Sequence, residues 1–195
     1  MSLSDSNSGE AERTVPEQLS DLERARRQKL ELLRARGIDP YPNDFRPTHT
    51  AARVLERYGS MDAETLAQTK DSVAVAGRIL TRRDFGKASF FHLLDRSGQI
   101  QVYVRRDLLG EEAFEIFKLT DLGDFVGVVG PPFRTRTNEL TIEAHQLRLL
   151  VKALRPLPEK WHGLTDVEAR YRQRYLDLIA NPASRQVFLL RSRII

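Results

Sequence analysis

The first part of the chain has the hydrophobic periodicity of an amphipathic helix. Between residues 19 and 37, leucines recur at helical spacing, with Ser20 or Asp21 available as an N-terminal cap and Gly37 as a stop. The stretch GIDPYPNDFRPTHT follows, and its prolines, Asn and Asp predict a surface loop. Two short helices are then predicted over AARVLERYG and DAETLAQT. Residues 19–71 are therefore expected to form an N-terminal helical region.

From Ser72 the periodicity is that of β-strands. Three strands are predicted over SVAVAGRILTRRDFG, ASFFHLLDRSG and QIQVYVRR, then a helix over DLLGEEAFEIFKLTDLG, then two strands over DFVGVVGPPFRTRT and ELTIEAHQLRLLVKAL. Five strands with a helix between the third and the fourth is the order of the OB-fold, a Greek-key barrel that binds oligonucleotides or oligosaccharides. We therefore expect an α+β chain with a five-stranded OB-fold β-barrel at residues 72–152. A generic five-stranded barrel fits the same pattern.

Alternation along these strands separates a core face from an outer face. In the second strand, Phe91 and Leu93 fall on the core face, and Phe90 and His92 fall on the outer face. The same parity places Gln101 of the third strand, and Glu139 and Thr141 of the fifth, on the outer face. An outward aromatic ring on a basic barrel can stack on an unpaired base. The alternative is a ring that another element covers, such as the N-terminal helix.

Composition narrows the class of protein. The 195 residues include no cysteine, which excludes a disulfide framework or a thiolate metal site. The four histidines show no ligand spacing, so no metal site is expected. No apolar run approaches the ~20 residues of a membrane helix. Residues 1–18 are polar and Ser-rich, which is typical of a disordered tail rather than a targeting signal. We expect a cytoplasmic protein that makes no membrane contact.

The positive charge is concentrated in the N-terminal helix. The whole chain carries a net charge of +4, and the segment from residue 24 to residue 36 holds six basic residues against one acid. On a helical projection, Arg24, Arg27 and Arg34 lie on one flank of the leucine stripe. This pattern fits a solvated amphipathic helix, and it fits equally an arm that binds nucleic-acid phosphates.

Three stretches of the chain resemble class II lysyl-tRNA synthetases. VAVAGRILTRRDFGKASFFHLLDRSGQIQVYV resembles the anticodon-binding barrel of that family, and RRQKLELLRARGIDPYPNDF resembles its N-terminal helix and loop. VKALRPLPEKWHGLTDVEARYRQRYLDLIAN resembles its linker between the barrel and the catalytic domain. Aspartyl and asparaginyl enzymes share the barrel, so the segments ALRPLP and EARYRQRYLDL favour the lysyl enzymes. The likeness runs from about residue 22 to residue 195.

The resemblance implies a role for the outer face of the barrel. In the family, an aromatic ring stacks on the central uridine of the lysine anticodon, and polar side chains read the edge of that base. The matching positions are Phe90 for stacking and Arg83, Gln101 and Glu139 for the edge. Uridine presents two carbonyl acceptors around one N–H donor, which suits donors from Arg and Gln and an acceptor from Glu.

Whether the predicted arginines can contact RNA depends on where the fold places them. Arg83 has the strand parity of the core residue Val75, so it reaches the outer face only if the strand bulges or bends, for example near Gly77. The basic flank of the N-terminal helix, Arg24, Arg27 and Arg34, would contact the tRNA backbone if the helix is a phosphate-binding arm.

The C-terminal end resembles the beginning of a catalytic domain. Residues 153–165 correspond to the linker, and residues 166–195 end in FLLRSRII, which resembles the opening of the motif 1 helix. That helix builds the homodimer interface of the full-length enzymes. Arg170, Arg172 and Arg174 meet the inner corner of a tRNA, pair with acidic neighbours in their own segment, or pack against the catalytic domain of the family.

Catalytic motifs 2 and 3, which bind ATP in this family, have no counterpart in the sequence, and no Gly-rich phosphate loop occurs. The full-length family uses ATP and Mg²⁺ to attach lysine to its tRNA. The resemblance therefore implies no cofactor for this chain and a lysine tRNA, bound at its anticodon loop, as its partner. We expect a catalytically silent, tRNA-binding part of a lysine–tRNA ligase that is truncated within motif 1. The alternative is a standalone OB-fold module that binds other RNA or a protein.

Overall fold

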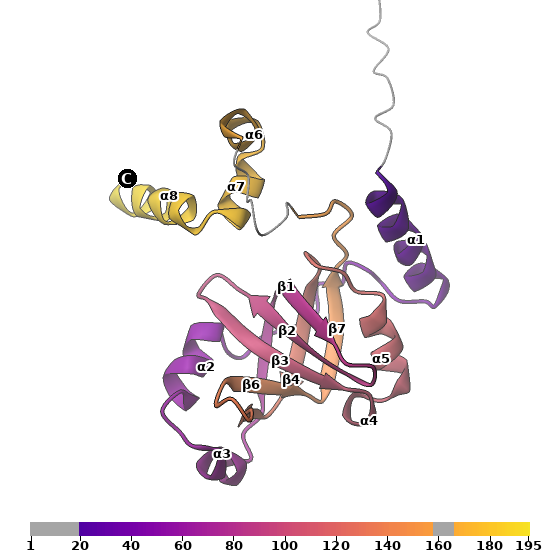
Figure 1. Cartoon of the computed structure of the whole chain (residues 1–195), viewed down its shortest axis with the longest axis vertical. Coiled ribbons are helices and arrows are strands. Elements are labelled where there is room, and N and C mark those ends of the chain that lie inside the picture. The colour runs from indigo at the N-terminus through magenta and orange to yellow at the C-terminus, as the bar shows by residue number, and fades with distance from the viewer. Residues whose placement is uncertain (1–19, 158–165) are drawn as a thin grey trace, which may run out of the picture.

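In the computed structural model, which describes residues 20–157 and 166–195, a single curved sheet forms the centre and helices lie around it (Figure 1). The predicted tail at residues 1–18 lies outside the described residues, as do residues 158–165 of the predicted linker. In the part of the chain that is described, no helix is both long enough and apolar enough to span a membrane.

The N-terminal helices lie where the sequence predicts them: α1 (Asp21–Ala35), α2 (Ala51–Tyr58) and α3 (Ala63–Thr69). Helix α1 begins with a capping box, in which the Ser20 hydroxyl accepts a hydrogen bond from the Glu23 N–H at 3.3 Å and the Glu23 carboxylate accepts one from the Ser20 N–H at 3.1 Å. The chain turns away just after α1 at Gly37, whose φ of +71° favours glycine.

The sheet has seven strands rather than the five predicted, and it is not closed into a barrel. The strands are β1 (Val73–Asp84), β2 (Ala88–Leu94), β3 (Gln99–Arg105), β4 (Phe125–Gly130), β5 (Pro132–Arg134), β6 (Leu140–Ala144) and β7 (Gln146–Val151). Their spatial order is β5-β6-β3-β2-β1-β4-β7. The pair of β3 and β6 is parallel, and the other neighbours are antiparallel.

The two additional strands come from breaks in the last two predicted strands. Pro131 has no N–H to donate to a ladder, so the predicted fourth strand divides into β4 and β5. The predicted fifth strand divides at His145, whose N–H donates to the carbonyl of Val129 at 2.9 Å. At that residue the chain stops pairing with β3 and begins to pair with β4. The order of elements predicted for an OB-fold is otherwise retained.

Strand β1 joins the two halves of the sheet. Residues 73–78 pair with β4, and residues 78–84 pair with β2. The close approach of β2 requires Gly77, because a Cβ atom at that position would lie 2.0 Å from Cδ2 of Leu93.

The predicted helix between the third and fourth strands is divided into α4 (Arg106–Leu109) and α5 (Glu111–Lys118) by Gly110, which has a φ of +86°. Helix α5 covers one end of the core. Its residue Phe117 is fully buried, and the Phe117 ring stacks on the ring of Phe91 with the centroids 5.7 Å apart.

The core face follows the predicted alternation. The buried hydrophobic residues of β2 and β3 are Phe91 and Leu93 in β2 and Ile100, Val102 and Val104 in β3. Thr141 pairs with Gln101 in the ladder between β6 and β3 and therefore lies on the outer face, as parity predicted, yet its side chain is fully buried. Its side chain can be buried because its hydroxyl group donates to Oε1 of Gln101 at 2.8 Å.

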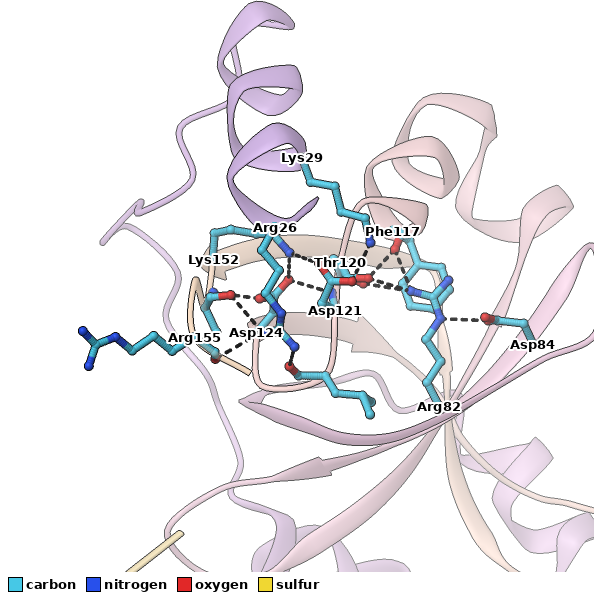
Figure 2. Close-up of polar contacts among 12 residues, drawn as sticks. Arg26, Lys29, Arg82, Asp84, Phe117, Thr120, Asp121, Asp124, Lys152 and Arg155 are labelled. Carbon is cyan, nitrogen blue, oxygen red and sulfur yellow. Dashed lines mark hydrogen bonds and ion pairs between the residues drawn. The ribbon is translucent and has the colours of Figure 1, made fainter. Parts of the chain in front are cut away.

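A buried charged cluster joins α1 to the sheet, and Figure 2 shows its contacts. The Arg26 guanidinium is almost fully buried and donates to the carbonyl of Ala153 and to that of Leu122, both at 2.9 Å. Lys29 Nζ lies 2.5 Å from Oδ1 of Asp121. Helix α1 is therefore held by polar contacts to two segments that lie more than ninety positions later in the chain.

Lys152 lies at the centre of the same cluster. Its Nζ donates to Asp121 at 2.6 Å and to Asp124 at 2.7 Å, and the side chains of Lys152 and Asp124 are fully buried. Burial opposes the ionised form of Asp121, but the hydrogen bonds from Lys152 and Lys29 outweigh it and hold the pKa of Asp121 below its usual value. At Asp124 burial dominates and raises the pKa despite the nearby Lys152 ammonium.

The described C-terminal residues form α6 (Val167–Arg172), α7 (Arg174–Ala180) and α8 (Pro182–Ile194). Asp177 is fully buried and accepts hydrogen bonds from Asn181 at 2.5 Å, Arg170 at 2.9 Å and Arg174 at 2.6 Å. The contact with Asn181 and those with the two arginines lower the pKa of Asp177 to about 2. Arg172 pairs with Glu168 at 3.6 Å. Acidic pairing, rather than tRNA contact, is therefore the interpretation that the geometry favours for these three arginines.

Candidate nucleic-acid interface

A pocket of about 330 Å³ lies on the outer face of the sheet, between β1, β2, β3 and the turn that precedes β6. It is lined by Thr81, Arg83, Phe85, Phe90, His92, Gln101, Thr135, Arg136, Thr137 and Glu139. The four side chains predicted to bind a base, Arg83, Phe90, Gln101 and Glu139, are all among them. The fold thus brings the predicted residues together from four separate segments of the chain.

Arg83 reaches the pocket through a β-bulge. The register between β1 and β2 places Ile79 opposite Leu93 and Thr81 opposite His92, so Leu80 is an additional residue in β1. Beyond the bulge the faces exchange, and Arg83 lies opposite Phe90. The bulge required by strand parity is therefore present, at Leu80 rather than at Gly77.

Phe90 is half-buried by two aromatic neighbours, one in β3 and one in the turn after β1. Its ring stacks on Tyr103 of β3, with centroids 4.4 Å apart and an interplanar angle of 27°. The ring of Phe85 meets it edge-on, with centroids 6.2 Å apart. The alternative in which the N-terminal helix covers the ring is not what the structure shows. Phe85 and Tyr103 contact part of the Phe90 ring, and the rest of the ring lines the pocket, where a ligand can reach it.

The polar groups of the pocket are already oriented by one another. Nε2 of Gln101 donates to Oε2 of Glu139 at 2.7 Å, and Oε1 of Gln101 accepts from the hydroxyl of Thr141 at 2.8 Å. Because the buried Thr141 hydroxyl occupies the carbonyl oxygen, the amide turns its NH₂ group toward Glu139 and keeps one N–H for a ligand. The Glu139 carboxylate has lone pairs left to accept from a ligand donor.

His92 and Thr81 line the pocket, and sequence reasoning did not identify them as site residues. Nδ1 of His92 lies 2.8 Å from the hydroxyl of Thr81, and Nε2 of His92 lies 3.3 Å from Oε1 of Glu139. Strand parity did place His92 on the outer face beside Phe90. The partners of His92 could not be predicted. Thr81 reaches His92 only because of the bulge in β1, and the turn that carries Glu139 reaches it only because β6 pairs with β3.

The arginines predicted to contact a tRNA backbone lie on α1 rather than in the pocket. Arg24 pairs with Asp21, and Arg34 pairs with Glu31 at 2.9 Å, whereas Arg27 is exposed. The pairs of Arg24 and Arg34 are on the surface, so they can open for a phosphate at little cost. Within the described ranges, no group of His, Asp and Glu residues could hold a metal ion.

Comparison with known proteins places this geometry in context. Residues 73–150 match the tRNA anti-codon family, described as an OB-fold nucleic acid binding domain. The chain is 51% identical over 181 residues to a lysine–tRNA ligase of Oceanobacillus iheyensis and 54% identical over 179 residues to one of Enterococcus faecalis. It is 52% identical over 170 residues to one of Anaeromyxobacter sp. strain K.

These alignments differ in how much of each partner they cover. They include 93%, 92% and 87% of this chain but only 37%, 36% and 33% of the three relatives. The chain therefore spans about a third of the length of the curated relatives it matches.

Proposed function

The chain is a homologue of the N-terminal part of lysine–tRNA ligases, and on that premise we propose that its sheet binds the anticodon loop of a lysine tRNA. The observation that carries the proposal is the convergence of Phe90, Arg83, Gln101 and Glu139 on one pocket. An aromatic surface, two donors and one acceptor are what a stacked uridine needs.

Within this proposal, each side chain has a separate task. Phe90 stacks on the base, while the free N–H of Gln101 and the Arg83 guanidinium donate to the two carbonyl oxygens of uridine. Glu139 accepts the N3–H of uridine. Cytidine has a lone pair at N3, which the carboxylate repels, and an amino group where uridine has a carbonyl oxygen. The pocket is therefore selective for uridine over cytidine.

The proposal extends to the full-length protein only through the relatives. For that protein we propose attachment of lysine to its tRNA with ATP and Mg²⁺ by a cytoplasmic homodimer. The described residues contribute tRNA recognition. Binding of an anticodon stem-loop by the 195-residue chain, tighter with uridine than with cytidine at the central anticodon position, is the primary test.

Replacing Glu139 by Gln is expected to relax this selectivity more than it lowers affinity. The amide offers a donor to N3 of cytidine, where the carboxylate repels it. One good base contact is worth about 1–3 kcal/mol of discrimination, so the ratio of the two affinities should fall roughly five- to 150-fold. Fluorescence anisotropy with the two stem-loops measures this ratio. Glu143→Gln is the matched control, because Glu143 belongs to the same sheet but does not line the pocket. An unchanged ratio in Glu139→Gln would remove Glu139 from base recognition.

The basic flank of α1 is expected to contribute affinity without selectivity. If Arg24, Arg27 and Arg34 bind phosphates, their joint replacement by Ala should weaken both stem-loop variants and a full-length tRNA by similar factors. The slope of log K against log salt should become shallower by about 0.7–0.9 for each phosphate that is no longer neutralised. Arg53→Ala on α2 is the control, since Arg53 is an exposed arginine on a different helix. An unaltered slope in the triple variant would show that this face is only solvated.

A further inference from the structure

We propose that His92 is a positioning residue that fixes the Glu139 carboxylate for base recognition, acting with the Thr81 hydroxyl behind it. The inference rests on the proposed function of the pocket and adds a residue to it. It starts from a continuous series of contacts on the outer face, in which Thr81, His92, Glu139 and Gln101 follow one another at 2.8, 3.3 and 2.7 Å.

Glu139 needs support because of its place in the chain. It precedes β6 at the end of a turn in which Asn138 has a φ of +64°, and its side chain is 46% exposed. A glutamate in such a position has several accessible rotamers. Gln101 holds only one of the two carboxylate oxygens. A second contact to the other oxygen, from His92, determines the plane of the carboxylate and hence the direction in which it accepts from a base.

The contact to Glu139 determines which ring nitrogen of His92 carries the proton, and the Thr81 hydroxyl suits the other nitrogen. A carboxylate can only accept, so Nε2 of His92 must carry a hydrogen to interact with Glu139. In the neutral ring Nδ1 is then an acceptor, and the Thr81 hydroxyl, 2.8 Å away, can donate to it. Thr81 occupies this place because the bulge at Leu80 turns it to the outer face. The bulge that brings Arg83 to the pocket therefore also supports Glu139.

The contact between His92 and Glu139 is not expected to stabilise the fold. The two side chains are 34% and 46% exposed, and a polar contact between side chains this accessible to water contributes little to the free energy of unfolding. Loss of this contact should instead reduce the selectivity for uridine over cytidine. His145 and Glu143 form a comparable pair that can serve as a control. Their distance from Nε2 to the carboxylate is also 3.3 Å, and neither residue lines the pocket.

A double-mutant cycle tests the proposal. His92→Leu introduces an apolar side chain of similar volume and removes both hydrogen bonds. In the otherwise unchanged chain it should lower the ratio of uridine to cytidine affinity by about three- to tenfold. In the Glu139→Gln background it should change that ratio by less than about twofold, because a residue that acts through Glu139 has no further effect once the carboxylate is gone. His145→Leu should leave the ratio unchanged in both backgrounds.

Two further variants separate positioning from a structural role. His92→Gln places an amide N–H near the position of Nε2 and should restore most of the selectivity, whereas Thr81→Val should lower it in the same direction as His92→Leu. Thermal unfolding of each variant should stay close to that of the unchanged chain. If His92→Leu unfolds, the selectivities of His92→Gln and Thr81→Val decide whether His92 positions Glu139. Retained selectivity in His92→Gln with reduced selectivity in Thr81→Val supports the proposal, and equal selectivity in the two variants contradicts it.

The failures of the two proposals are distinguishable. If the unchanged chain binds no stem-loop, or does not prefer uridine, the proposed function is wrong. If the unchanged chain does prefer uridine and His92→Leu prefers it equally, the positioning role of His92 is wrong and the proposed function stands. Equal losses from His92→Leu in the presence and absence of the Glu139 carboxylate would show that His92 acts on the base directly, which also overturns the proposal.

Discussion

Truncating Phe91 to Ala should destabilise the protein by about 3–5 kcal/mol, whereas truncating its neighbour Phe90 should mainly weaken RNA binding. Phe91 is fully buried and stacks on Phe117 of α5, so its removal leaves a cavity in the core. Phe90 contacts Tyr103 on the outer face, and removal of that aromatic pair should cost only about 0.5–1.5 kcal/mol. Stacking of a base on an aromatic ring is worth about 1–3 kcal/mol, so Phe90→Ala should lower stem-loop affinity roughly five- to 150-fold.

Each residue is the control for the other, because the two are adjacent in one strand and have the same side chain. Urea unfolding followed by fluorescence gives the stability of each variant, and anisotropy with the uridine stem-loop gives its affinity. If Phe90→Ala unfolds the protein while Phe91→Ala only weakens binding, the assignment of the two faces is reversed.

The second large effect is expected at Lys152. Replacement by Met should destabilise the protein by about 3–5 kcal/mol, because the fully buried Asp124 carboxylate would lose its cation while remaining out of water. Asp124 cannot move to solvent easily, since its Oδ1 also accepts the N–H of Ala153 at 2.7 Å. The unfolding midpoint in urea, measured at neutral pH, would report the destabilisation.

Two variants make the result specific. Lys118→Met removes a lysine whose partner, Glu115, is a surface residue, and it should change stability by less than about 0.5 kcal/mol. Asp124→Asn combined with Lys152→Met removes the unpaired charge and keeps an acceptor for the backbone, so it should recover part of the stability. A Lys152→Met protein as stable as the Lys118→Met protein would contradict the importance of the buried pair.

Much of the fold follows from local patterns. The alternation of ASFFHLLD and QIQVYV assigns the core and outer faces of β2 and β3, because a strand with one buried face has a side-chain period of two. Helix α1 was predicted from its leucines, its Ser20 cap and Gly37. Parity even showed that Arg83 required a bulge, although it did not locate the bulge at Leu80.

The remaining features depend on contacts between distant segments. The division of the last two predicted strands at Pro131 and His145 reflects a change of pairing partner, which alternation within one segment does not encode. The burial of Thr141 depends on the amide of Gln101, forty residues earlier in the chain. The sequence suggested Arg24, Arg27 and Arg34 as the notable arginines of α1, yet Arg26 is the buried one. Its carbonyl partners belong to the segments just before β4 and just after β7, which are distant in the chain.

The anchoring of α1 also has a consequence for synthesis of the protein. The carbonyl partners of Arg26 lie 96, 127 and 129 positions later in the chain. At about 5–20 residues per second, the ribosome produces Ala153 roughly 6–25 s after Arg26. A helix of this length is marginal by itself in water, so α1 is exposed to chaperones and proteases during that interval. Helix α1 is therefore synthesised before every strand of the sheet but can dock only after the last strand, β7, has been made.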